Sequence, residues 1–267
     1  MLTLDIKITN LCNYRCEYCY GLNDSKSMDE EMFRKVLSIA EKLKFEAIEF
    51  CGGEPLVHPK FAQFTELAKK FKLILRTNGM LIEKHKEIIS KYYTWVGVSL
   101  DGTAQINHIM RKANVNISAA SQFNTPINNI KALKQLNPNI NILLGSLVSQ
   151  INYDSILELG DYIVKNKIPI DLWKLYLFRG KRERAKENEN KFILSEKEFE
   201  KLHFNKIKTV LQKGSTNSGE CFIVSPDGNI ALGSTVIANI NDSGNKIINA
   251  INTRIKKVLE NKKTTYS

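Results

Sequence analysis

The feature that most constrains the fold is a repeated alternation of short apolar runs with amphipathic segments over the first 178 residues. The opening stretch LTLDIKIT alternates apolar and polar residues strictly, and a period of two predicts a strand. Further strands are predicted at residues 46–50, 72–77, 95–99, 139–148 and 170–178, and helices at 29–43, 61–71, 82–92, 127–136 and 153–166. Six strands that alternate with helices predict a parallel sheet with right-handed crossovers.

The polar residues of the first strand favour a curled sheet over an open one. Thr3, Asp5, Lys7 and Thr9 share one face of that strand. Such a face suits a strand that lines a cavity better than one that lies beneath a layer of helices. We therefore predict an α/β fold in which residues 1–178 form a partial (β/α)6 TIM-like barrel.

The character of the chain changes after Phe178. Residues 179–191 are charged and predict a loop, and residues 195–213 predict a helix opened by a capping box of Ser195 and Glu198. Residues 220–233 predict a β-hairpin around the turn sequence PDG, and residues 245–263 a last helix. We expect residues 179–267 to form an extension that covers the substrate side of the barrel.

Composition sets the broad class of the protein. A chain of 267 residues with 43% hydrophobic residues can bury one large core. It has no run of 18 apolar residues and no signal-peptide pattern at its start, so we expect a soluble, cytoplasmic protein without membrane partners. The formal charge of +11 is compatible with an anionic ligand, although lysines scattered over helix faces are more often solvated surface.

Three cysteines stand within the eight residues CNYRCEYC, directly after the first strand. In a reducing compartment, Cys12, Cys16 and Cys19 indicate a metal centre rather than disulfides. A structural zinc site needs four protein ligands, and the chain has no second C-x2-C knuckle. A [4Fe–4S] cluster bound by three thiolates keeps one iron open for an external ligand. The loop also follows a strand at the carboxyl end of a parallel sheet, where functional sites gather.

The C-x3-C-x2-C spacing resembles the signature of the radical S-adenosylmethionine (SAM) superfamily. The resemblance implies a [4Fe–4S] cluster whose open iron binds SAM, and reductive cleavage of SAM to a 5′-deoxyadenosyl radical. It also implies SAM contacts that follow the cysteines in the family's order. Tyr18 would lie beside adenine, GGEP would bind the amino group, and Asn78 would lie on the same rim. Ser99 and Asp101 of SLDG would face the ribose or methionine carboxylate, Arg111 would pair with that carboxylate, and Ser146 and Val148 would border adenine. The residues of GGEP are Gly52, Gly53, Glu54 and Pro55.

The later part of the chain resembles viperin-like members, which are radical SAM nucleotide dehydratases. That resemblance covers residues 171–202 and the predicted hairpin, and it implies an anionic small-molecule substrate, such as a nucleotide, bound by Lys174, Tyr176 and Arg179. One departure weakens the nucleotide interpretation. Leu143 and Gly145 stand where viperin-like proteins carry a lysine and an asparagine that grip the triphosphate. The resemblance also implies an electron donor such as flavodoxin or ferredoxin.

Two alternatives remain open. A radical SAM enzyme that modifies a peptide or protein fits the same motifs, but Cys221 is the only cysteine of the extension, so we expect no auxiliary cluster. A zinc- or nucleic-acid-binding module would use the positive charge instead, and we consider nucleic acid an unexpected partner. No protein side chain is assigned a catalytic role by the sequence.

Overall fold

The computed structural model describes residues 1–22, 24–180, 183–213 and 221–262. It divides into two compact units that interleave along the chain. Unit 1 comprises Met1–Leu11, Asn23–Leu75 and Ser215–Ser267, and unit 2 comprises Cys12–Leu22 and Arg76–Gly214. The expected domain boundary at residue 178 stays a prediction.

Unit 1 is built on a mixed sheet. Its strands are β1 (Thr3–Thr9), β2 (Ala47–Gly52), β3 (Lys72–Thr77, shared with unit 2 at its end), β8 (Phe222–Val224), β9 (Asn229–Leu232) and β10 (Thr235–Asn239). They follow the order β10-β9-β8-β1-β2-β3, in which β8, β1, β2 and β3 are parallel and β9 is antiparallel to both its neighbours. The helical elements are α1 (Glu30–Lys42), η1 (Pro55–Val57), α2 (Phe61–Ala68) and α11 (Gly244–Lys262).

The core of unit 1 is aromatic and lies between α1, α2 and β2. Phe33 of α1 stacks on Phe64 of α2 at 4.2 Å between ring centroids and meets Phe50 of β2 edge-on at 5.7 Å. The predicted alternation of β1 is confirmed in its middle, because Ile6 and its neighbours two positions away are buried, whereas Asp5 and Lys7 are half-buried. The apolar face of β1 therefore belongs to the core.

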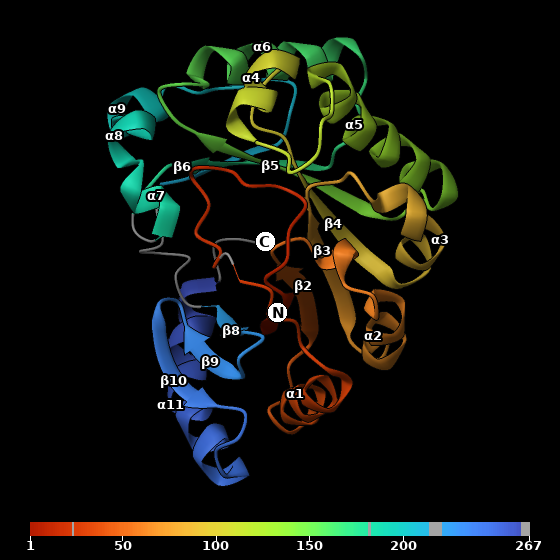
Figure 1. Ribbon diagram of the computed structural model, residues 1–267, viewed down its shortest axis with the longest axis vertical. Helices are drawn as coiled ribbons and strands as arrows, with labels where there is room; N and C mark the ends of the chain where they lie inside the picture. Colours follow the sequence, from red (N-terminus) through yellow and green to blue (C-terminus); the bar gives the residue numbers. More distant parts are fainter. Residues whose placement is uncertain (23, 181–182, 214–220, 263–267) are drawn as a thin grey trace. The chain divides into compact units, whose positions relative to one another are not determined.

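Unit 2 carries the parallel strands β4 (Tyr93–Ser99), β5 (Asn141–Val148), β6 (Leu172–Leu177) and β7 (Thr209–Gln212) in that order. Its helices are α3 (Ile82–Tyr92), α4 (Ala104–Met110), α5 (Ala119–Leu136), α6 (Tyr153–Lys165), α7 (Glu183–Glu187), α8 (Glu189–Phe192) and α9 (Glu196–Phe199). Figure 1 shows α5 and α6 along one side of β5 and β6. Trp173 of β6 is buried in a core cluster that also contains Leu144 of β5 and Leu159 of α6.

The α/β class is confirmed, with β1 to β6 alternating with helices as a partial (β/α)6 barrel requires. Two predictions for the extension were wrong. The charged stretch 179–191 holds α7 and α8 in place of a loop, and the helix predicted over 195–213 stops at Phe199, after which residues 209–212 form β7. The capping box of Ser195 and Glu198 is present. The hairpin is also confirmed, with Gly228 at φ +80° in its turn.

His58 links two segments of unit 1 as a neutral side chain. Its Nδ1 accepts a hydrogen bond from the Lys60 N–H at 3.1 Å, so the proton resides on Nε2, which lies 3.0 Å from the Met28 carbonyl and donates to it. The ring also lies 4.8 Å from the ring of Phe64. Burial lowers the pKa of His58 below its ordinary value of 6.5.

The lowered pKa predicts an acid-sensitive contribution to stability. At a pH above 6.5 the imidazole is neutral in both states, and its contribution is complete. As the pH falls through 6.5, the unfolded chain binds a proton first, so the free energy of unfolding decreases. We expect His58→Gln to flatten this dependence of urea unfolding between about pH 7.5 and about pH 5.5. The exposed His203, replaced in the same way, serves as a control and should keep the slope of the parent protein.

Candidate functional site

The three cysteines of the C-x3-C-x2-C motif lie on one loop of unit 2. None of the three forms a disulfide, and Cys16 is buried at 7% exposure whereas Cys12 and Cys19 are half-buried. The loop packs into an apolar cluster formed by its own tyrosines and by side chains from three other segments. These residues are Tyr14, Tyr18, Met110, Phe178, Ala185 and Phe192.

The sulfur atoms have surroundings that fit iron–sulfur ligands. The Tyr14 N–H donates to Cys12 Sγ at 3.3 Å, and the Gly21 N–H donates to Cys19 Sγ at 3.2 Å. Such N–H bonds to sulfur are one of the means by which proteins tune these clusters. Among the described residues, no three His, Cys, Asp or Glu side chains are grouped to hold a single metal ion. A four-iron cluster makes a different demand, since each thiolate binds its own iron.

Burial and charge act in opposite directions on Cys16. Burial raises the pKa of the Cys16 thiol, and the positive charge of Arg111 counteracts part of that rise. A metal ligand has to be a thiolate. Arg111 therefore favours the ionised form that a cluster needs.

Backbone and amide contacts hold the loop from one side. The side chain of Asn78, a residue predicted from the sequence, donates to Asn13 Oδ1 at 2.7 Å. The Arg15 N–H donates to the Lys112 carbonyl at 2.6 Å, and the Asn114 side chain donates to the Cys12 carbonyl at 2.9 Å. The segment after α4 thus fixes the path of the loop. Only Asn78 among these residues was suggested by the sequence.

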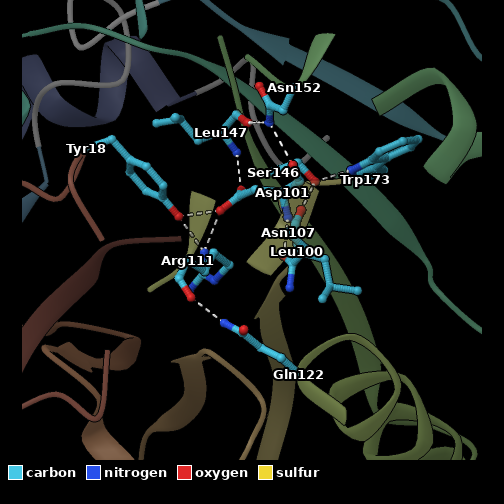
Figure 2. A network of polar contacts seen from close by, with 10 residues as sticks. All are labelled: Tyr18, Leu100, Asp101, Asn107, Arg111, Gln122, Ser146, Leu147, Asn152 and Trp173. Atoms are coloured by element: carbon cyan, nitrogen blue, oxygen red, sulfur yellow. Dashed lines mark hydrogen bonds and ion pairs between the residues drawn. The ribbon is translucent and has the colours of Figure 1, made fainter. Parts of the chain in front are cut away.

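Three of the predicted SAM contacts meet one another inside unit 2 (Figure 2). The Tyr18 hydroxyl donates to Asp101 Oδ2, and Arg111 Nη1 lies 2.8 Å from the same oxygen. Arg111 Nη1 also donates to the Tyr18 hydroxyl at 2.9 Å. Burial raises the pKa of Tyr18 well above its ordinary value, so the phenol stays protonated and acts as a donor to Asp101.

The predicted adenine contacts lie deeper in the fold. Ser146 is fully buried, donates to the Leu100 carbonyl and accepts from Trp173 Nε1 at 2.9 Å. Val148 is fully buried within the core that contains Trp173. Ser99 is half-buried and pairs with Gly145 in the register of β4 and β5. The SAM roles of Ser99, Ser146 and Val148 stay predictions.

The GGEP motif lies in unit 1, where nearby backbone atoms require glycine at its first two positions. Gly52 has φ +139°, and a Cβ there would lie 2.2 Å from the Thr9 carbonyl oxygen. A Cβ on Gly53 would lie 2.2 Å from the carbonyl oxygen of Leu11, the residue that precedes Cys12 in the sequence. Both positions are therefore closed to any side chain by the backbone that follows β1. Their contact with SAM stays a prediction.

The remaining residues of GGEP open a short helix. Glu54 is 1% exposed, and its carboxylate accepts from the Leu56 N–H at 3.1 Å, as an N-cap does. Pro55 is the first residue of η1, a position that needs no N–H donor. In this motif, Gly52 and Gly53 are thus required for steric reasons, and Glu54 caps the short helix.

The predicted substrate residues differ in their surroundings. Lys174 is 9% exposed, and its Nζ lies 5.2 Å from the centre of the Tyr176 ring. Arg179 instead forms an ion pair with Glu196 and donates from Nε to the Lys213 carbonyl at 2.9 Å. The structure thus brings Lys174 and Tyr176 together, and it engages Arg179 in contacts within the extension.

The sequence did not suggest that the extension packs on the cysteine loop. Phe192 of α8 meets Tyr18 edge-on at 5.8 Å between ring centroids. Glu17 of the loop forms ion pairs with Lys112 and with Lys191 of α8. Only Ala185, within the charged stretch, and Phe192, directly after it, could have signalled this packing.

The comparisons with known proteins decide the family. The model of the Radical SAM superfamily matches residues 6–163. The chain belongs to the radical SAM superfamily. The cofactors of this family are a [4Fe–4S] cluster and SAM. In the part of the chain that the structure describes, no helix is both long and apolar enough to cross a membrane.

The relatives of this radical SAM chain differ in what their names describe. It is 29% identical over 182 residues to an S-adenosylmethionine-dependent nucleotide dehydratase of Selenomonas ruminantium, covering 64% of both chains. It is 27% identical over 178 residues to a GTP 3',8-cyclase of Helicobacter pylori, covering 62% of this chain and 53% of the cyclase. In both comparisons, less than two thirds of the relative's length is covered.

Solved structures share the fold at lower identity. The structure of native anSMEcpe with bound AdoMet gives a TM-score of 0.72 at 19% identity, covering 93% of this chain and 80% of that one. Streptococcus suis SuiB bound to the precursor peptide SuiA gives a TM-score of 0.65 at 15% identity, covering 93% and 64%. These likenesses concern the fold alone.

The close approach at Gly53 predicts a sharp effect of a single methyl group. We expect Gly53→Ala to lower the free energy of unfolding by about 1–3 kcal/mol, because the methyl group meets backbone that cannot move aside. Gly244→Ala is the matched control, since no atom beyond its chain neighbours and the nearby backbone of its own helix lies within 4 Å of the place that its methyl group would occupy. Urea unfolding of both variants checks this. Equal stability of the two would contradict the steric argument.

Proposed function

We propose that this chain is a radical SAM enzyme that holds one [4Fe–4S] cluster through Cys12, Cys16 and Cys19. The observation that carries the proposal is the presence of all three thiols on one loop, within an apolar enclosure and with N–H donors to two of the sulfurs. When bound, the cluster and SAM supply reductive cleavage of SAM and a 5′-deoxyadenosyl radical that abstracts hydrogen from the substrate.

The chain's own residues have three tasks in this reaction. The apolar side chains around the loop exclude water, which protects a reactive radical from unwanted hydrogen donors. Asn78 and Arg111 position the loop. The GGEP segment and the ends of the strands orient SAM, as the family resemblance implies. The electron comes from a small donor protein such as flavodoxin or ferredoxin.

The proposed substrate is an anionic small molecule of the nucleotide class. The Selenomonas and Helicobacter relatives are both named for reactions of nucleotides. Within unit 2, Lys174 points to the face of β6 opposite Trp173, which belongs to the core. In the parallel register, Lys174 pairs with Gly145, and Gly145 pairs with Ser99. The Lys174 ammonium and the Ser99 hydroxyl thus belong to the same line of paired residues across three strands. A cation and a hydroxyl placed in this way suit an anionic group.

The cysteines provide the first test of this function. After anaerobic reconstitution we expect about four irons per chain and formation of 5′-deoxyadenosine when SAM and a reductant are added. Alanine in place of Cys12, Cys16 or Cys19 should abolish 5′-deoxyadenosine formation, because each thiolate binds a separate iron. Iron analysis and chromatography of the products measure the two results.

Cys51 and Cys221 supply the matched controls, because both are cysteines outside the loop and neither forms a disulfide. Their alanine variants should retain iron and SAM cleavage at the level of the parent protein. If the loop variants also cleave SAM normally, the proposed cluster site is wrong.

A substrate screen tests the nucleotide class. Nucleoside mono-, di- and triphosphates are compared with short peptides for substrate-dependent 5′-deoxyadenosine formation. For the nucleotide that responds, we expect Lys174→Met to reduce kcat/KM by about 10- to 100-fold, the loss typical of one hydrogen bond to a charged group. Lys165→Met, which removes an exposed lysine at the end of α6, is the matched control and should keep the parental kcat/KM. A response to peptides alone would replace the nucleotide class with peptide modification.

A further inference from the structure

The Asp101 carboxylate accepts hydrogen bonds from three different segments of unit 2. Oδ2 accepts from the Tyr18 hydroxyl of the cysteine loop and from Arg111 Nη1 at 2.8 Å. Oδ1 accepts from the Leu147 N–H of β5 at 2.7 Å. The side chain is 1% exposed, so water does not compete for these positions. Asp101 therefore joins the loop between Cys16 and Cys19 to strand β5.

The backbone of Asp101 is held just as closely (Figure 2). Its N–H donates to Asn107 Oδ1 at 2.9 Å, and its carbonyl accepts from Asn152 Nδ2 at 2.8 Å. Asn152 Nδ2 also donates to the Leu147 carbonyl at 2.7 Å. With main chain and side chain both fixed, the carboxylate has one orientation to offer to Tyr18.

Charge balance requires this arrangement. Arg111 has a side chain that is 12% exposed, and Asp101 is its counter-ion. The Tyr18 hydroxyl joins the pair, because it donates to Asp101 Oδ2 and accepts from Arg111 Nη1 at 2.9 Å. A single ion pair thus ties together the loop, β5 and the residue after α4. The Arg111 guanidinium also lies 5.7 Å from the ring of Tyr14, a second residue of the loop.

We propose that Asp101 is a positioning residue for the cluster thiols. It holds Tyr18 and Arg111 in place and thereby fixes Cys16 and Cys19, which flank Tyr18 on the loop. This role differs from the direct contact with SAM that the family resemblance implies for Asp101 and Arg111. It rests on the proposed function in so far as the three thiols are taken as cluster ligands.

A measurement made without SAM distinguishes the positioning role of Asp101 from direct contact with SAM. Outer residues that orient metal ligands typically contribute about 10- to 100-fold in metal affinity. We expect Asp101→Asn and Tyr18→Phe to release iron to a chelator about 10- to 100-fold faster than the parent protein. The electron paramagnetic resonance spectrum of the reduced, SAM-free cluster should change in both variants, because the thiolates are held differently.

Glu17→Gln is the matched control. Glu17 lies on the same loop, but its side chain is 24% exposed and its ion pairs with Lys112 and Lys191 are at the surface. Its release rate and spectrum should stay within about twofold of the parent protein, as surface ion pairs contribute little. Unchanged release and spectra in Asp101→Asn and Tyr18→Phe, with weakened SAM binding, would overturn the proposal in favour of direct SAM contacts.

A second measurement, made on the cluster-free protein, tests the positioning role of Asp101 without iron. Cys16 is 7% exposed, so its alkylation by iodoacetamide, followed by mass spectrometry, reports how firmly the loop is held. We expect the rate to rise about tenfold in Asp101→Asn and in Tyr18→Phe, the change typical of losing one hydrogen bond to a charged group. Equal rates in all proteins would overturn the positioning role. If the parent protein takes up no iron, the proposed function fails, and the alkylation rates still decide the role of Asp101.

Should Asp101→Asn fail to fold, Tyr18→Phe decides alone, because it removes one hydroxyl and leaves the ion pair of Asp101 and Arg111 intact. The circular dichroism of Tyr18→Phe should match the parent protein while its alkylation of Cys16 accelerates. A folded Tyr18→Phe variant with parental alkylation and iron release would contradict the proposal.

Discussion

The buried ion pair of Asp101 and Arg111 is the interaction on which the arrangement of unit 2 depends. Removing a charge from water costs several kcal/mol, and the attraction within a pair offsets this only when the other hydrogen-bonding positions are also filled. Asp101 accepts two further hydrogen bonds, from the Tyr18 hydroxyl and the Leu147 N–H, whereas the buried Arg111 Nε has no hydrogen-bond partner among the described residues. This arrangement needs a strand, a helix end and the cysteine loop in one place. The pair therefore specifies the loop's position even where its net contribution to stability is small.

The enclosure of the cysteine loop combines apolar packing with charges at the surface. Burying a phenylalanine side chain contributes about 1.5–3 kcal/mol, and Phe192 contacts both Tyr18 and Phe178. The exposed ion pairs of Glu17 contribute much less, because solvent screens them. The short helices α7 and α8 thus owe their position to a few buried side chains. Their charged residues keep the outer surface solvated.

Periodicity predicted the six strands of the barrel and most of its helices, but it missed α4 and the first two turns of α5, and it did not predict the contacts of the extension. The first strand and the helix capped by Asp29 could be read from local patterns, because each buries one face on its own. Residues 179–192 lack such a pattern, since burial of Ala185 and Phe192 depends on a loop more than 160 positions earlier in the chain. β7 escaped prediction for the same reason, because residues 209–212 become a strand by pairing with β6.

The candidate site likewise contains residues that the local sequence identifies and residues whose contacts depend on tertiary structure. The cysteines and GGEP are recognisable because spacing alone identifies them, whereas the partner of Arg111 is a matter of tertiary structure. The family resemblance implied that Arg111 pairs with the carboxylate of SAM, and the structure pairs it with Asp101. The glycines of GGEP were expected to admit a ligand. In the structure, glycine is required at these positions because the carbonyl groups of Thr9 and Leu11 occupy the space that a side chain would need.

The residues that pair across β5 and β6 in unit 2 show why the substrate is harder to infer than the type of reaction. On the face of β6 opposite the core, Lys174 pairs with Gly145, while Leu172 in the row before it pairs with Leu143. Viperin-like proteins carry a lysine and an asparagine at the positions of Leu143 and Gly145, so this face offers fewer donors to a phosphate chain. A Cβ on Gly145 would lie 3.5 Å from Tyr176, an ordinary contact, so the glycine is not required by the fold. Its absence of a side chain therefore leaves space beside Lys174, and in the proposed function that space belongs to the substrate.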